Sequence, residues 1–77
     1  MNIAFYSGPN CHLCDDAMAL LKQSVRWEKL TIETFNIRED TRLYHLYAVR
    51  IPVLKRLDND QELGWPFDLD RLEQFLQ

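Results

Sequence analysis

The segment at residues 2–6, NIAFY, limits the possible folds more than any other feature of this chain. It is a short apolar run without polar alternation, which is typical of a central strand with both faces covered. The turn-forming residues SGPN follow it directly. A strand that is buried on both sides needs elements on both faces of its sheet, so the run predicts an α/β fold with helices on either side.

The first helix is predicted from about residue 11 to residue 24. Asn10 is its expected N-cap, because a short polar side chain there can accept a hydrogen bond from the first turn. Asp15 and Asp16 fall in the first turns, where the helix dipole favours acidic residues. The apolar residues at helical spacing are Leu13, Ala17, Leu20 and Leu21.

A second strand and a second helix follow. Residues 29–37, KLTIETFNI, are rich in β-branched and aromatic residues and predict the strand. Asp40 is placed to cap a helix that runs to about Val49. Pro52 sets a boundary after this helix, because a residue that precedes proline disfavours the helical conformation. The predicted apolar face of the helix comprises Leu43, Leu46 and Tyr47.

The last third of the chain predicts a hairpin and a helix. Residues 52–57 and 61–65 form two short strand patterns that flank the tight turn DND. Asp68 is the expected N-cap of the last helix. The apolar face of that helix comprises Leu69, Leu72, Phe75 and Leu76.

These elements give the order β-α-β-α-β-β-α within a single domain, residues 1–77. The first two strands are joined by a helix, so they must pair in parallel, whereas the closing hairpin is antiparallel. We therefore expect a four-stranded mixed sheet flanked by helices on both faces.

Composition limits the partners and the compartment. The formal net charge is −3 and no block of Lys and Arg occurs, so we expect neither nucleic acid nor an anionic membrane as the main partner. No apolar run approaches the roughly 20 residues that span a bilayer, and the N-terminus lacks the features of a signal peptide. We therefore expect a cytoplasmic protein, in a compartment that keeps thiols reduced.

The motif CHLC at residues 11–14 carries the candidate chemistry. Its two cysteines could be a redox dithiol, half of a metal site, or two unrelated thiols. Structural zinc needs four ligands, and only His12 and His45 could supplement the pair. The loop between Cys11 and Cys14 is too short to stabilise the fold by cross-linking. A redox dithiol is therefore the favoured interpretation, with no metal bound.

The position of the motif assigns different roles to the two cysteines. Cys11 falls where a strand ends and a helix begins, and the unpaired amides of a helix N-terminus favour a thiolate. We expect Cys11 to be the attacking, exposed thiol and Cys14 the buried, resolving one. His12 lies between them and either stabilises the thiolate or is an ordinary solvent-exposed residue.

Three segments resemble glutaredoxins. YSGPNCHLC at 6–14 resembles their YSKPxCPYC, RIPVL at 50–54 is similar to TVPxV, and GWPFDL at 64–69 falls where they carry GGxDDL. The resemblance spans the whole chain and is closest to short bacterial glutaredoxin-like proteins whose CxxC site lacks the proline. It implies the glutaredoxin branch of the thioredoxin-like fold, catalytic Cys11 and Cys14, and a cis Pro52 that faces the dithiol and keeps its strand available for pairing with substrate. The substrate groove that it implies is lined by Tyr6, Arg50, Ile51, Gly64, Trp65 and Asp68.

The chain departs from the glutaredoxin pattern where glutathione would bind. Gly8 replaces the lysine, Trp65 replaces the second glycine, and only Asp68 remains of the acidic pair. These departures predict weak use of glutathione. They leave the dithiol chemistry untouched.

The resemblance thus implies a thiol–disulfide oxidoreductase that reduces protein or small-molecule disulfides. It needs no dissociable cofactor, and its electron donor is either a reductase of the flavoenzyme type or, less readily, glutathione. Two alternatives remain open. One is a redox-inert module that binds peptides, and the other is a metal or iron–sulfur scaffold that two chains share through Cys11.

Overall fold

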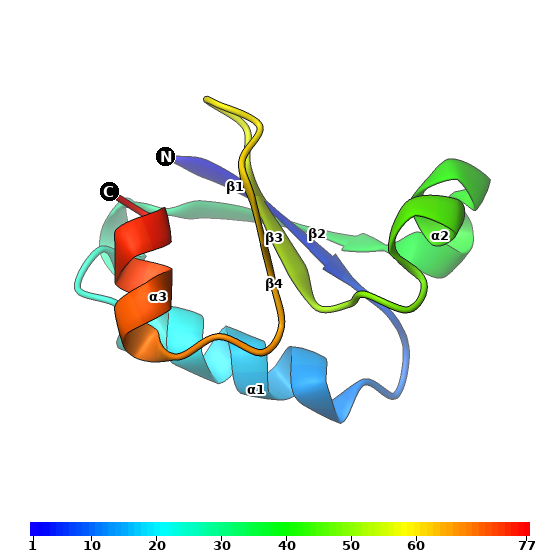
Figure 1. Ribbon diagram of the computed structural model, residues 1–77, viewed down its shortest axis with the longest axis horizontal. Helices are drawn as coiled ribbons and strands as arrows, with labels where there is room; N and C mark the ends of the chain where they lie inside the picture. Colours follow the sequence, from blue (N-terminus) through cyan, green and yellow to red (C-terminus); the bar gives the residue numbers. More distant parts are fainter.

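The computed structural model describes residues 1–77 and has the predicted element order (Figure 1). None of its helices has the length and apolarity needed to cross a bilayer. Short 3-10 turns at Trp27–Lys29 and Ile37–Glu39 flank the second strand. The strands are β1 (Asn2–Ser7), β2 (Thr31–Asn36), β3 (Val53–Arg56) and β4 (Glu62–Gly64), and the helices are α1 (His12–Gln23), α2 (Thr41–Tyr47) and α3 (Leu69–Phe75).

The four strands form one mixed sheet in the order β2-β1-β3-β4. β1 runs parallel to β2, as the intervening helix requires, and antiparallel to β3. β3 and β4 form the predicted antiparallel hairpin. The apolar run at residues 2–6 is therefore a central strand, as its sequence indicates.

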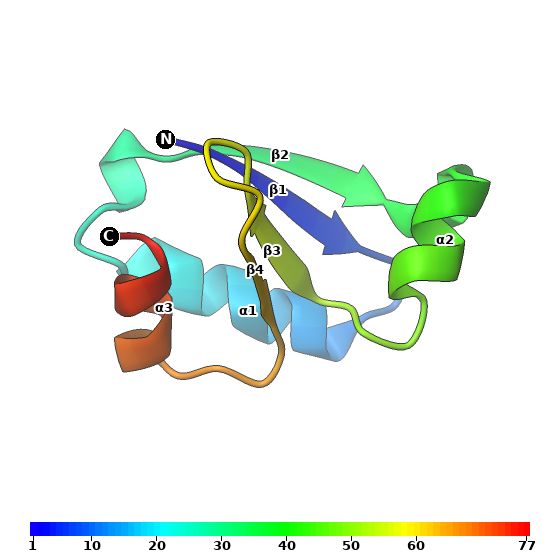
Figure 2. The ribbon, with the colours of Figure 1, turned by 45° about the horizontal axis from the view of Figure 1, so that its top comes forward.

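Both faces of the sheet carry a hydrophobic core. Alternate residues of β1 point to opposite faces, so Ile3 and Phe5 enter one core while Ala4 and Tyr6 enter the other. α1 and α3 lie on the first face, and α2 lies on the second, at one end of the sheet (Figures 1 and 2). The first core comprises Ile3, Phe5, Cys14, Ala17, Leu21, Leu54, Leu63, Phe67, Leu72 and Leu76, and the second comprises Ala4, Tyr6, Ile37, Tyr47 and Val53.

The helix N-termini confirm two predicted caps and correct a third. Asp40 accepts hydrogen bonds from Arg42 N and Leu43 N, and Asp68 accepts one from Arg71 N at 2.8 Å. The prediction for Asn10 was wrong, because Cys11 is the N-cap of α1. Asn10 instead has φ 55°, in the left-handed region that asparagine tolerates, and it turns the chain ahead of the helix.

The second helix is shorter than predicted, and one residue of its expected apolar face is exposed. α2 ends at Tyr47 rather than near Val49. Tyr47 is buried, but Leu46 is 59% exposed. A helix of two turns at one end of the sheet buries only a narrow stripe of its surface, and the exposure of Leu46 puts it outside that stripe.

Arg56 is a buried charge that ties the C-terminus to the sheet. It is only 8% exposed. Its guanidinium donates to both carboxylate oxygens of Asp58 and to the carbonyls of Phe75 and Gln77. These partners replace the water that burial removes, and they fix the end of α3 against the hairpin.

Candidate active site

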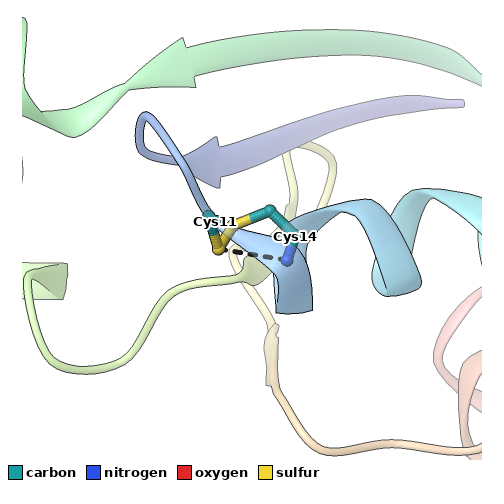
Figure 3. The surroundings of a disulfide bond; sticks show 2 residues. All are labelled: Cys11 and Cys14. Carbon is teal, nitrogen blue, oxygen red and sulfur yellow. Dashed lines mark hydrogen bonds between the residues drawn. A yellow bond between two sulfur atoms is a disulfide. The ribbon is translucent and has the colours of Figure 1, made fainter.

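The two cysteines lie at the junction of β1 and α1 and are joined by a disulfide (Figure 3). Their Cα atoms are 5.2 Å apart. Cys11 caps α1, and its Sγ accepts a hydrogen bond from Cys14 N at 3.0 Å. Cys14 is 4% exposed and belongs to the core beneath α1, whereas Cys11 is partly exposed. The accessible sulfur is therefore the first one, as the sequence predicts.

The local sequence explains this placement. β1 ends at Ser7, and the Gly8–Pro9–Asn10 turn reverses the chain before the first helical residue, His12. The first backbone hydrogen bond of α1 runs from Asp15 N to Cys11 O at 3.2 Å. The amide of Cys14 in this first turn donates to the Cys11 sulfur, and a hydrogen-bond donor on sulfur stabilises its charged form.

The segment that carries Pro52 lies against the turn before Cys11. A Cβ atom added to Gly8 would be 3.0 Å from Ile51 Cδ1, so the glycine permits this close approach. Between them opens a cleft of about 370 Å³. Its lining comprises Gly8, Pro9, Asn10, Ile37, Arg38, Tyr44, Ala48 and Ile51.

The Ile51–Pro52 peptide bond is cis, the isomer that the resemblance implies. A second cis bond, Trp65–Pro66, was not anticipated from the sequence. The Pro52 side chain is fully buried. The N–H of Ile51 donates to Tyr47 O at 3.1 Å, and no backbone donor bonds the Ile51 carbonyl. Of the two groups of this residue, only the carbonyl is free for pairing with a substrate chain.

Tyr6 does not line the groove, so this assignment was wrong. Its side chain is 8% exposed and lies in the core under α2. The ring stacks on Tyr47 with a centroid separation of 4.3 Å and an interplanar angle of 13°. The strand period explains the error, because Tyr6 points to the face of the sheet opposite to that of Phe5 and α1.

Arg50 is already paired within the protein. Its Nη2 donates to Glu62 Oε1 at 2.9 Å, and its guanidinium lies 5.2 Å from the Tyr47 ring centroid. The Tyr47 hydroxyl donates to Glu62 Oε2 at 2.6 Å. These hydrogen bonds, first that from Tyr47 and then that from Arg50, hold the pKa of Glu62 below its usual value. Burial, and then the bond to Glu62, raises the pKa of Tyr47.

Three further predicted groove residues, Gly64, Trp65 and Asp68, lie from the end of β4 to the start of α3. Gly64 is exposed, and a Cβ atom added there would have no neighbour within 4 Å. The Trp65 ring packs edge-to-face on Phe67, and the backbone N–H of Trp65 donates to Pro52 O at 3.1 Å. That bond joins the end of β4 to the Pro52 segment. The carboxylate of Asp68 is occupied in capping α3.

His12 is exposed on the first turn of α1 and forms no hydrogen bond or ion pair with another residue. No group of three or more His, Cys, Asp or Glu side chains in the structure is arranged to hold a metal ion.

The sequence did not reveal the roles of Tyr47, Glu62 and Arg38. Tyr47 was expected only as part of an apolar helix face, and Glu62 only as a strand residue. Arg38 is exposed and is the one charged residue that lines the cleft. Alternation in residues 61–65 could have placed Glu62 on the α2 side of the sheet, but its partners come from elsewhere in the chain.

A four-stranded mixed sheet between helices, with a CxxC disulfide at the N-terminus of the first helix, defines a thioredoxin-fold protein with a dithiol site. The glutaredoxin-like domain (DUF836) matches residues 2–77, and the chain belongs to this family.

Solved structures agree with this assignment. The chain is similar to protein XcR50 from X. campestris, with 35% identity, a TM-score of 0.84, and 96% of this chain and 93% of the other covered. Protein Ne2328 from Nitrosomonas europaea is 32% identical with a TM-score of 0.75, over 99% and 91% of the two chains. Thioredoxin 1 from Thermosipho africanus TCF52B, at 17% identity, a TM-score of 0.66 and coverage of 99% and 94%, shows the fold alone. No curated protein matches the sequence.

Proposed function

We propose that this protein is a thiol–disulfide oxidoreductase that reduces protein or small-molecule disulfides through Cys11 and Cys14. The observation that carries the proposal is the pairing of an accessible N-cap sulfur with a buried sulfur one helical turn later. The N–H of Cys14 at 3.0 Å from Cys11 Sγ supports the first cysteine as the nucleophile.

In the reduced protein, the Cys11 thiolate attacks one sulfur of a substrate disulfide. A bond forms between that sulfur and Cys11 Sγ, the substrate disulfide breaks, and its other sulfur leaves as a thiolate that takes a proton from water. Cys14 loses its proton to solvent and attacks Cys11 Sγ, which releases the second substrate thiolate for protonation. The substrate gains two electrons and two protons, and the protein ends as the Cys11–Cys14 disulfide.

Regeneration needs two electrons from outside. A reductase of the flavoenzyme type is the donor that we favour, with glutathione as the weaker one, since Arg50 is paired with Glu62 and Gly8 supplies no cation. The reaction uses no dissociable cofactor or metal, and neither nucleic acid nor a membrane is a partner. A cytoplasmic location fits a dithiol that must return to its reduced state.

Three measurements on the purified protein test the proposal. Free thiols are counted before and after dithiothreitol, bound metal is determined, and reduction of a disulfide-containing peptide is followed with Cys11→Ser as the inactive control. We expect two additional thiols after reduction, no bound metal, and a turnover that Cys11→Ser abolishes. A metal that copurifies would favour the scaffold alternative. A Cys11–Cys14 disulfide that dithiothreitol reduces, but whose dithiol no substrate disulfide oxidises again, would favour the redox-inert module.

A further inference from the structure

Tyr47 occupies a junction that the dithiol chemistry alone does not explain. Its carbonyl accepts hydrogen bonds from Arg50 N at 2.8 Å and from Ile51 N at 3.1 Å. Its hydroxyl donates to Glu62 Oε2 on β4 at 2.6 Å. One residue at the end of α2 therefore fixes the backbone of the Pro52 segment and is itself anchored to the far edge of the sheet.

The Tyr47 side chain has little freedom. It is buried, with Tyr6 stacked against its ring and the Arg50 guanidinium 5.2 Å from the ring centroid. Glu62 binds both Tyr47 and Arg50, with one carboxylate oxygen for each. Charge-assisted bonds at a partly buried site are stronger than neutral ones. Glu62 thus links Tyr47 and Arg50, the two ends of the turn at residues 47–50, into a closed turn.

This closed turn constrains the backbone of Ile51, whose carbonyl accepts no backbone hydrogen bond. The Ile51 N–H is held by Tyr47, and the Ile51 side chain lines the cleft beside the CxxC turn. A substrate chain that pairs with a backbone group needs that group in a fixed direction. A small disulfide that has no peptide backbone does not need it.

We propose that Tyr47 and Glu62 are positioning residues that orient the backbone of Ile51 for pairing with an extended polypeptide, so that the site selects polypeptide disulfides over small aliphatic ones. This inference rests on the proposed function. Neither residue touches the reacting sulfur atoms, and both act through Ile51.

The test compares two substrates across matched variants. Tyr47→Phe keeps the stacked ring and removes the hydroxyl, and Glu62→Gln removes the charge that Arg50 binds. Glu33→Gln is the control, because Glu33 lies in the same cross-strand row as Glu62, through Ala4 and Lys55, but is exposed and forms no hydrogen bond. The substrates are a disulfide-containing peptide and bis(2-hydroxyethyl) disulfide, with dithiothreitol as the electron donor that regenerates the dithiol and the rate without protein subtracted.

We expect kcat/KM for the peptide, divided by that for the small disulfide, to fall by roughly 2- to 30-fold in Tyr47→Phe and Glu62→Gln, the range for coupling through a contact network. The ratio should not change in Glu33→Gln. Equal losses on both substrates would mean a purely structural role and would overturn the inference while the proposed function stands. A wild-type protein that reduces neither substrate would refute the proposed function and the inference together.

Amide exchange supplies a readout that does not depend on activity. The Ile51 amide should exchange faster in Tyr47→Phe than in the wild type. The Ala48 amide, bonded to Tyr44 O within the preceding turn of the helix, is the internal reference and should stay protected. Unchanged protection of Ile51 would contradict the positioning role even if the ratio of the two kcat/KM values had fallen.

Discussion

Replacing Gly8 with lysine should improve the use of glutathione. Gly8 stands where the glutaredoxins that this chain resembles carry a lysine that contacts the tripeptide. Arg50 is paired with Glu62 and is not free to replace that lysine. Arg38 lines the same cleft as Gly8 but comes from a different segment, the turn Ile37–Glu39, so it does not stand at the lysine's position. We therefore expect the wild-type protein to have a high KM for glutathione.

Two opposing effects determine how much Gly8→Lys changes the binding free energy of glutathione. A regained hydrogen bond to a charged group contributes about 1.5–3 kcal/mol. The new Cβ would be 3.0 Å from Ile51 Cδ1, the end of a flexible side chain. Moving the Ile51 side chain away from its preferred rotamer costs about 0.5–1.5 kcal/mol. The net gain is then centred near 1.3 kcal/mol, which is roughly an eightfold lower KM.

The assay is steady-state reduction of a glutathione mixed disulfide at varied glutathione concentration. Gly8→Ala is the matched control, because it introduces the same Cβ without the charge. We expect KM to fall in Gly8→Lys and to stay level or rise in Gly8→Ala. An equal improvement in both variants would refute the electrostatic argument. A wild-type KM at the level of ordinary glutaredoxins would refute the prediction of weak glutathione use itself.

Three further predictions concern the site and its support. Iodoacetamide at mildly acidic pH should label Cys11 before Cys14 in the reduced protein, and peptide mapping that finds the reverse order would exchange their roles. His12→Pro should make the dithiol more reducing by roughly 30 mV if the imidazole contributes one pKa unit of thiolate stabilisation, and an unchanged potential in a redox titration would make His12 a bystander. The hydrogen bond from Ser24 holds the pKa of Glu73 below its ordinary value, so its stabilisation is present above about pH 4.5 and is lost as the pH falls through the lowered pKa. Urea midpoints of the wild type and Glu73→Gln should therefore differ at neutral pH and converge in acid, and a constant gap would contradict this.

Local signals were sufficient to predict the element order. The apolar run at 2–6, the helical spacing after Cys11 and the caps Asp40 and Asp68 each depend on a few neighbouring residues. The relative burial of Cys11 and Cys14 also followed from the position of a strand end before a helix start. The residues that determine these features lie close to them in the sequence, within one or two helical turns.

The errors arose where the outcome depends on distant residues. Tyr6 was assigned to the groove from its place in a motif, yet the strand period and the partners Phe35 and Tyr47 put it in the opposite core. The bond between Tyr47 and Glu62 spans α2 and β4 and depends on sheet register. Asn10 was a plausible cap by composition, but its left-handed backbone made Cys11 the cap.

The departures from the glutaredoxin pattern are physically linked to one another. Gly8 removes a cation and at the same time lets Ile51 approach the CxxC turn. Ile51 is held in that place by the hydrogen bond that its N–H donates to the Tyr47 carbonyl. Glu62, which anchors the Tyr47 hydroxyl, also neutralises Arg50. The same contacts that orient the segment therefore keep Arg50 paired, which removes a second candidate cation for glutathione. A site with fewer free cations and a fixed, unpaired carbonyl is better suited to a polypeptide backbone than to the two carboxylates of a small peptide thiol.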